Sequence, residues 1–186
     1  MNKQALLIRK NRITVPNTVK VFLDSTSMRF EGPLGVIHFD FTRHDFHGVY
    51  SVTIDVSNEN IQTIVICSCA KTFSDSLKGL FLMYITGVVS GYIIHLDLVG
   101  VGYKSQIVHD TLHLKLGFSH VIQCAIPSDI RMLISKSNRI SLYGLDKARV
   151  NQIAAQLRSI KPPEAYKGKG IRLQTETIIL KEGKKK

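Results

Sequence analysis

Short runs of alternating apolar and polar residues dominate the first half of the chain. This alternation predicts half-buried strands at 19–23, 36–41 and 50–56, and a more continuously apolar run at 61–67 predicts a further strand. Between two of these runs, Gly32-Pro-Leu-Gly35 is typical of a turn. We therefore expect strands connected by hairpins in this half.

A helical period follows these strands. Apolar residues recur at helical spacing from Leu77 to Tyr84, which predicts one buried helix face. Ser74 and Asp75 are the candidate N-cap residues, because their side chains can accept a hydrogen bond from the first turn. We expect this helix to end near Gly87.

The second half of the chain repeats the same order of strands and helix. Alternating runs predict strands at 92–99, 103–108, 111–116 and 121–126, and a hairpin with strands at 130–135 and 139–143. Asp146 is the predicted N-cap of a helix that continues to Ile160. The expected buried stripe of this helix is Val150, Ile153, Ala154, Leu157 and Ile160.

The two halves are also similar in sequence. The segment EGPLGVIHFDF at 31–41 resembles HLKLGFSHVIQCAI at 113–126, and each hairpin leads into one helix. We therefore predict an α+β protein of two tandem related small domains, each an antiparallel or mixed sheet packed with one main helix. The expected divisions are a basic N-terminal arm (1–12), an N-terminal domain (13–91), a C-terminal domain (92–172) and a basic C-terminal tail (173–186).

Positive charge is concentrated near the two ends of the sequence. Of the net charge of +11, residues 1–12 contribute +4 and residues 158–186 contribute +6, which leaves +1 on everything between them. Basic segments beside a nearly neutral body are typical of proteins that bind a polyanion. The charge distribution therefore favours a nucleic acid as the partner.

The segment 158–172 carries most of the candidate chemistry. Prolines at 162–163 end the preceding helix, and in Lys167-Gly-Lys-Gly170 the glycines remove side-chain bulk where a partner would approach the backbone. Alternating ammonium groups on such a loop suit a phosphate backbone. The alternative is a solvated basic loop with glycine turns. Tyr166 either stacks on an unpaired base or packs back over the prolines.

Two other features favour different classes of function. His44-Asp45-Phe-His47 offers imidazole and carboxylate ligands, as in a zinc-dependent hydrolase, although zinc sites have a further ligand at a recognisable spacing. The uncharged run 79–94 beside basic ends would suit a peripheral membrane protein. It is too short for a transmembrane helix, which needs about 20 apolar residues. Because no acid–base pair or complete nucleotide-binding motif is present, we expect a non-enzymatic protein without a cofactor.

Several segments match one known family. LVGVGYK at 98–104, LGFSH at 116–120 and the region 144–172 resemble the universal sixth protein of the large ribosomal subunit. Within that region, PEAYKGKGI at 163–171 is similar to the family's signature run. The resemblance extends to ITVPNTVKV at 13–21 and is weaker over the rest of the N-terminal half.

The resemblance implies a structural protein with two related α+β domains that binds large-subunit rRNA mainly through its C-terminal domain. It places such a protein near the base of the lateral stalk and the sarcin–ricin loop, with neighbouring large-subunit proteins and docking translation factors as further partners. The matched segments and the basic residues together give these expected rRNA-binding residues: Lys104, Ser119, His120, Lys161, Tyr166, Lys167, Gly168, Lys169, Gly170, Arg172, Lys184, Lys185 and Lys186.

The expected compartment follows from the cysteines, the composition and the family resemblance. Three cysteines without a secretory signal favour a reducing compartment, and we expect Cys67 and Cys69 to be small buried side chains on one strand face. The many Ile, Phe and Tyr residues and the divergent N-terminal half favour an organelle-encoded protein. We therefore expect a ribosome of the mitochondrial matrix, with a plastid or the bacterial cytoplasm as alternatives, and no membrane partner.

Overall fold

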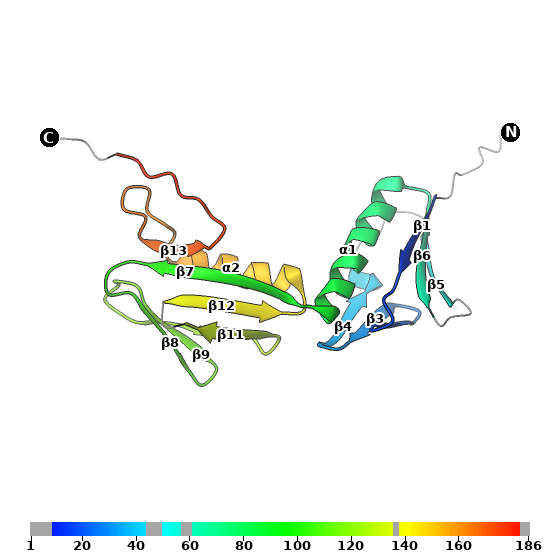
Figure 1. Cartoon of the computed structure of the whole chain (residues 1–186), viewed down its shortest axis with the longest axis horizontal. Helices are drawn as coiled ribbons and strands as arrows, with labels where there is room; N and C mark the ends of the chain where they lie inside the picture. Colours follow the sequence, from blue (N-terminus) through cyan, green and yellow to red (C-terminus); the bar gives the residue numbers. More distant parts are fainter. Residues whose placement is uncertain (1–8, 44–49, 57–60, 136–137, 183–186) are drawn as a thin grey trace. The chain divides into compact units, whose positions relative to one another are not determined.

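The computed structural model of the chain describes residues 9–43, 50–56, 61–135 and 138–182. The chain divides into two compact units, Met1–Gly91 and Tyr92–Lys186. In the described part of each unit, antiparallel strands accompany one α-helix (Figure 1). The predicted α+β fold is therefore confirmed.

The first unit contains two three-stranded sheets. One has the strand order β1 (Arg9–Thr14), β6 (Gln62–Ser68), β5 (Tyr50–Val56), and the other has the order β2 (Lys20–Leu23), β3 (Ser27–Gly32), β4 (Gly35–Asp40). A short 3-10 turn, η1 (Phe41–Arg43), follows the second sheet. Helix α1 (Lys71–Val89) buries Phe81 against this sheet, with ring centroids 5.7 Å from Phe30 and 5.5 Å from Phe39.

Helix α1 begins earlier than its sequence indicates. Its N-cap is Ala70, which provides no side-chain hydrogen bond. The predicted caps instead face strand β1, where the Asn11 amide donates to the Ser74 hydroxyl (2.8 Å) and to the Asp75 carboxylate (2.9 Å). The prediction of a cap at Ser74 or Asp75 was wrong because these oxygens accept from a strand distant in sequence. The helix also continues past Gly87 to Val89.

The second unit repeats the topology of the first. Its larger sheet has the order β11 (Ile130–Ile134), β12 (Arg139–Gly144), β7 (Tyr92–Val99), β13 (Gly170–Leu173), and its smaller sheet has the order β10 (Ile122–Ala125), β9 (Thr111–Lys115), β8 (Lys104–Val108). Thus β7–β12–β11 corresponds to β1–β6–β5, and β8–β9–β10 corresponds to β2–β3–β4. Strand β13 has no counterpart in the described residues of the first unit.

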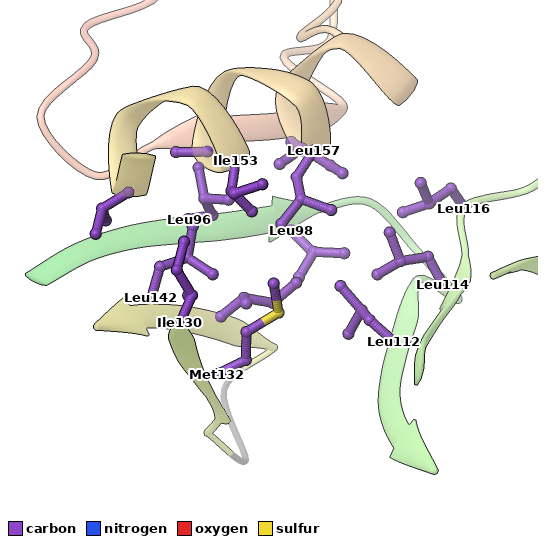
Figure 2. Packing of buried hydrophobic residues seen from close by; sticks show 14 of the residues in the cluster. Leu96, Leu98, Leu112, Leu114, Leu116, Ile130, Met132, Leu142, Ile153 and Leu157 are labelled. Carbon is purple, nitrogen blue, oxygen red and sulfur yellow. The ribbon is translucent and has the colours of Figure 1, made fainter. Parts of the chain in front are cut away.

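Helix α2 (Lys147–Ile160) matches its sequence prediction. The Asp146 carboxylate caps it by accepting from the Ala148 N–H at 2.9 Å. Figure 2 shows Ile153 and Leu157 of this helix facing Leu96 and Leu98 of β7. The same buried cluster includes Leu112, Leu114, Leu116, Ile130, Met132, Leu142, Val150 and Ala154.

Three smaller expectations differ from the structure. Residues 9–12, expected in a basic arm, belong to β1 and pair with β6. The expected tail from residue 173 starts inside β13, and its next residues are bonded to the second unit. Cys67 is only half-buried although it lies within strand β6. Cys69 is exposed, because the strand ends at Ser68 and Cys69 lies beyond it.

Candidate nucleic-acid interface

The segment between α2 and β13, residues 161–169, is here called the basic loop. Its two ends are joined, because the Ile171 N–H donates to the Lys161 carbonyl oxygen at 2.8 Å. Inside it, the Glu164 N–H donates to the Lys169 carbonyl oxygen (2.8 Å), and the Gly168 N–H donates to the Glu164 carbonyl oxygen (2.9 Å). The loop is therefore a closed, internally bonded structure with its lysines on a fixed backbone.

The glycine at the end of the basic loop has an internal role. Gly170 is buried with φ +146°, and a Cβ there would lie 2.6 Å from the Pro162 carbonyl oxygen and 2.7 Å from the Pro163 Cα. The sequence predicted that the glycines of this segment let a partner come close to the backbone. At this position, the atoms that come close belong instead to the chain's own prolines. Gly168 has φ +65°, a left-handed conformation that favours glycine.

Residues 174–182 fold back beside the basic loop, and we call them the strap. The Arg158 guanidinium holds the Glu176 carboxylate at two points, with Nε 2.9 Å from Oε2 and Nη2 bonded to Oε1. Their mutual hydrogen bonds raise the pKa of Arg158 and lower the pKa of Glu176. Farther along the strap, the Lys181 N–H donates to the Ala165 carbonyl oxygen at 2.9 Å. This part of the expected tail is thus built into the second unit.

The three segments that carry the sequence resemblance lie together in this unit. The Tyr103 ring packs against Gly100, because a Cβ added to Gly100 would lie 2.6 Å from the ring. The ring also approaches Gly117, where an added Cβ would lie 3.5 Å from it. The Lys161 ammonium lies 4.7 Å from the centroid of the Phe118 ring. Contacts therefore connect the 98–104 segment to the 116–120 turn, and this turn to the basic loop.

The expected cationic residues differ in exposure. Lys104 and Lys167 are exposed, whereas Lys161, Lys169 and Arg172 are half-buried. Within the described parts of the chain, none of the four lysines forms an ion pair with a carboxylate. Positive charge on these lysines is therefore left available to an external anion.

Arg172 has a different setting, in the middle of β13. It lies directly across from Asp97 of β7 in the strand register, and the Asp97 carboxylate is paired with Arg139 of β12, with Nε 2.8 Å from Oδ1. Two arginines thus stand on the strands that flank one aspartate, in the same register row. This row of the sheet keeps a net positive charge.

The other expected contact residues occupy the surface of the same unit. Ser119 and His120 are exposed in the turn between β9 and β10, and Tyr166 has 58% of its surface exposed. No ring pair or cation–π contact within the described residues involves Tyr166, and both of its expected roles, stacking on a base and packing over the prolines, stay predictions. Lys184, Lys185 and Lys186 lie outside the described residues.

Two further candidate residues for the interface were absent from the sequence prediction. Lys115 lies directly across from Lys104 in the β8–β9 pair, and both are exposed. Directly opposed like charges repel, so an anion between them would relieve a local cost. Phe118, the other residue, belongs to the LGFSH run that resembles the family. An aromatic residue next to polar residues in this run was the sequence signal that could have identified it.

The features that suggested other classes of function receive no support from the described residues. His44, Asp45 and His47 lie outside them, and inside them no three His, Cys, Asp or Glu side chains are placed to hold a metal ion. The run 79–94 is shared between α1 and β7, with Phe81, Ile85 and Val88 buried in the first unit. No described helix has the length and apolar character needed to cross a bilayer.

Comparison with known proteins identifies the family of the chain. The family model described as Ribosomal protein L6 matches residues 99–173, which include the three connected segments apart from Leu98. Large ribosomal subunit protein uL6 of Methylobacillus flagellatus is 36% identical over 179 residues, covering 96% of this chain and 98% of that protein. The uL6m protein of Reclinomonas americana is 38% identical over 190 residues, and uL6 of Thermosipho africanus is 34% identical over 185, each with the same coverage. The chain therefore belongs to the family of large ribosomal subunit protein uL6.

Proposed function

We propose that this chain is a structural constituent of the large ribosomal subunit that binds large-subunit rRNA through its second unit. Its relatives of nearly equal length carry the name large ribosomal subunit protein, which supports this assembly as the partner. Proteins of this family are structural and not enzymatic. The proposed role is accordingly to hold folded rRNA in place and so to support translation.

The observation that carries the proposal is the contact between the basic loop and the 116–120 turn. Lys161 and Phe118 are 43 positions apart in the sequence, yet the ammonium lies 4.7 Å from the ring. This contact gathers Lys161, Lys167 and Lys169 with the turn on one compact unit. Clustered cations without carboxylate partners are the electrostatic footprint of a phosphate backbone.

The rigidity of the basic loop supports binding by shape. Its internal hydrogen bonds and the Gly170–Pro162 contact fix the backbone before any partner arrives. A preformed loop loses less conformational entropy on binding than a loose one, so more of the interaction energy appears as affinity. Folded RNA is read mainly through its backbone and its irregular junctions, which suits such a rigid cationic surface.

The finer location follows from the family resemblance. We place the second unit near the base of the lateral stalk and the sarcin–ricin loop, with other large-subunit proteins and translation factors as neighbours. Lys184, Lys185 and Lys186 would extend from the strap along the same RNA. The relatives include uL6m and bacterial uL6 proteins at similar identity, so the expected mitochondrial compartment stays a prediction.

Co-sedimentation tests the assembly. The tagged full chain, expressed in its source organism, should sediment with large subunits through a sucrose gradient at high salt. It should leave that fraction when the rRNA is digested with nuclease. Recovery of the chain near the top of the gradient, away from the rRNA, would contradict the proposed function.

A further inference from the structure

Two exposed aromatic rings lie stacked beside the basic loop. The centroids of Phe118 and His120 are 6.3 Å apart, and the ring planes differ by 26°. The Lys161 ammonium is 4.7 Å from the Phe118 centroid. Phe118 keeps 38% of its surface exposed, and Ser119 and His120 on the same turn are exposed as well. The two rings are thus nearly parallel and partly open to the surroundings, with the Lys161 cation over the Phe118 ring.

The backbone turns this pair away from the core. Strand β9 and the residue after it bury Leu112, Leu114 and Leu116 in turn. At Gly117, with φ +77°, the chain changes direction, and the residues from 117 to 121 are all exposed. The Phe118 ring therefore lies at the surface, where the exposed 38% can accept a contact from outside the chain.

We propose that the Phe118–His120 pair is a platform on which one unpaired base of the rRNA stacks, while Lys161 binds a phosphate next to that base. The inference rests on the proposed function and deepens it, because it adds an unpaired nucleotide to the recognised RNA features. Proteins recognise unpaired bases by stacking them on aromatic rings, and such stacking tolerates any base. The platform thus fits a bulged or looped nucleotide and not a continuous helix.

An internal role for the ring pair makes a different prediction. If Phe118 served only to hold Lys161 in position, its loss would release Lys161 and remove a phosphate contact. Each phosphate contact contributes somewhat less than one unit to the slope of log K against log salt concentration. Loss of stacking alone would lower the affinity and leave this slope unchanged.

The test is equilibrium binding of the full chain to deproteinised large-subunit rRNA over a series of salt concentrations. Phe118→Leu keeps apolar volume without a ring, and we expect about a tenfold loss of affinity with the wild-type slope. Phe118→Tyr keeps the ring and should bind like wild type. Zero-length photo-crosslinking followed by peptide mapping should place a nucleotide on residues 116–121 in wild type and lose that cross-link in Phe118→Leu and His120→Ala.

The outcomes separate the two levels of the proposal. If the wild-type chain does not bind the rRNA in a salt-dependent manner, the proposed function fails and the stacking inference fails with it. If wild type binds but Phe118→Leu binds equally well, or loses about one unit of slope, only the stacking inference is overturned. Circular dichroism checks the fold of each variant. His120→Ala, which changes an exposed residue, keeps the cross-linking test decisive if Phe118→Leu unfolds.

Discussion

Gly170 and Pro162 are in backbone contact at the closure of the basic loop. A Cβ added to Gly170 would lie 2.6 Å from the Pro162 carbonyl oxygen, well inside the ordinary separation of two such atoms. Nearby, the Ile171 N–H donates to the carbonyl oxygen of Lys161. The geometry that positions the loop lysines thus depends on the absence of a side chain at position 170.

Gly170→Ala should destabilise the second unit. The new Cβ meets backbone atoms that cannot move aside cheaply, and φ +146° is itself unfavourable for alanine. We expect a loss of about 2–3 kcal/mol in the free energy of unfolding, measured by urea denaturation.

The matched control for this substitution is Gly79→Ala. Gly79 lies in the exposed face of α1, and nothing is within 4 Å of the position where its Cβ would be. Alanine there should stabilise the first unit by about 0.5–1 kcal/mol. Equal effects of the two substitutions would show that the Gly170 contact is unimportant.

The strap should be bound less strongly to α2 in acid. Because the hydrogen bond to Arg158 lowers the pKa of Glu176 in the folded chain, the ion pair contributes its full stability above the pKa of an unfolded glutamate, about 4.3. That contribution is lost as the pH falls through the lower folded pKa. Both side chains are partly exposed, so we expect about 0.5–1 kcal/mol.

A double-mutant cycle with Arg158→Gln and Glu176→Gln measures this pair. The coupling between the two substitutions should be present at neutral pH and vanish in acid. A coupling that stays constant across that range would rule out the Glu176 carboxylate as the group that holds the strap.

Removal of two loop cations should change the salt dependence of RNA binding. Lys167→Gln with Lys169→Gln removes two proposed phosphate contacts, so the slope of log K against log salt should become less steep by about 1.4–1.8 units. Filter-binding titrations with large-subunit rRNA provide the measurement.

Lys71→Gln with Lys78→Gln is the control with the same loss of charge. Both residues belong to α1 in the first unit, away in sequence from the basic loop. This variant should retain the wild-type slope. Equal flattening by the two double variants would mean that RNA responds to net charge and not to the basic loop.

The two helix starts should respond differently to loss of an aspartate. Asp146→Ala removes the carboxylate that caps α2 and should cost about 1 kcal/mol in unfolding free energy. Asp75→Ala removes an exposed hydrogen bond from Asn11 and leaves the N-cap at Ala70 unchanged, so its cost should be about 0.5 kcal/mol or less. Thermal or urea unfolding of both variants distinguishes the two roles, and a larger loss for Asp75→Ala would contradict the structural assignment.

The sequence predicted those elements whose local signals agree with their tertiary packing. Helix α2 is one of them, because the Asp146 cap and the apolar stripe both indicate the helix that forms. The start of α1 was missed, because the oxygens of Ser74 and Asp75 accept from Asn11, more than 60 positions earlier. Local propensity carries no information about such a partner.

For the candidate site, the sequence identified the charged residues but not the contacts that hold them in position. Lys167 and Lys169 are apparent in the printed sequence, whereas the ion pair between Arg158 and Glu176 joins residues without any local pattern. The sequence therefore places the strap in the basic C-terminal tail. The role of Gly170 was likewise read as space for a partner, because the Pro162 backbone that fills this space becomes visible only in the fold.

A cryo-electron-microscopy reconstruction of the large subunit containing this chain tests the central claim most directly. We predict that the Lys167 or Lys169 ammonium lies within hydrogen-bonding distance, about 3 Å, of an rRNA phosphate oxygen. The basic loop should follow the sugar–phosphate chain along its length. A reconstruction in which residues 161–169 face open solvent or another polypeptide, with no RNA backbone beside them, would contradict the account.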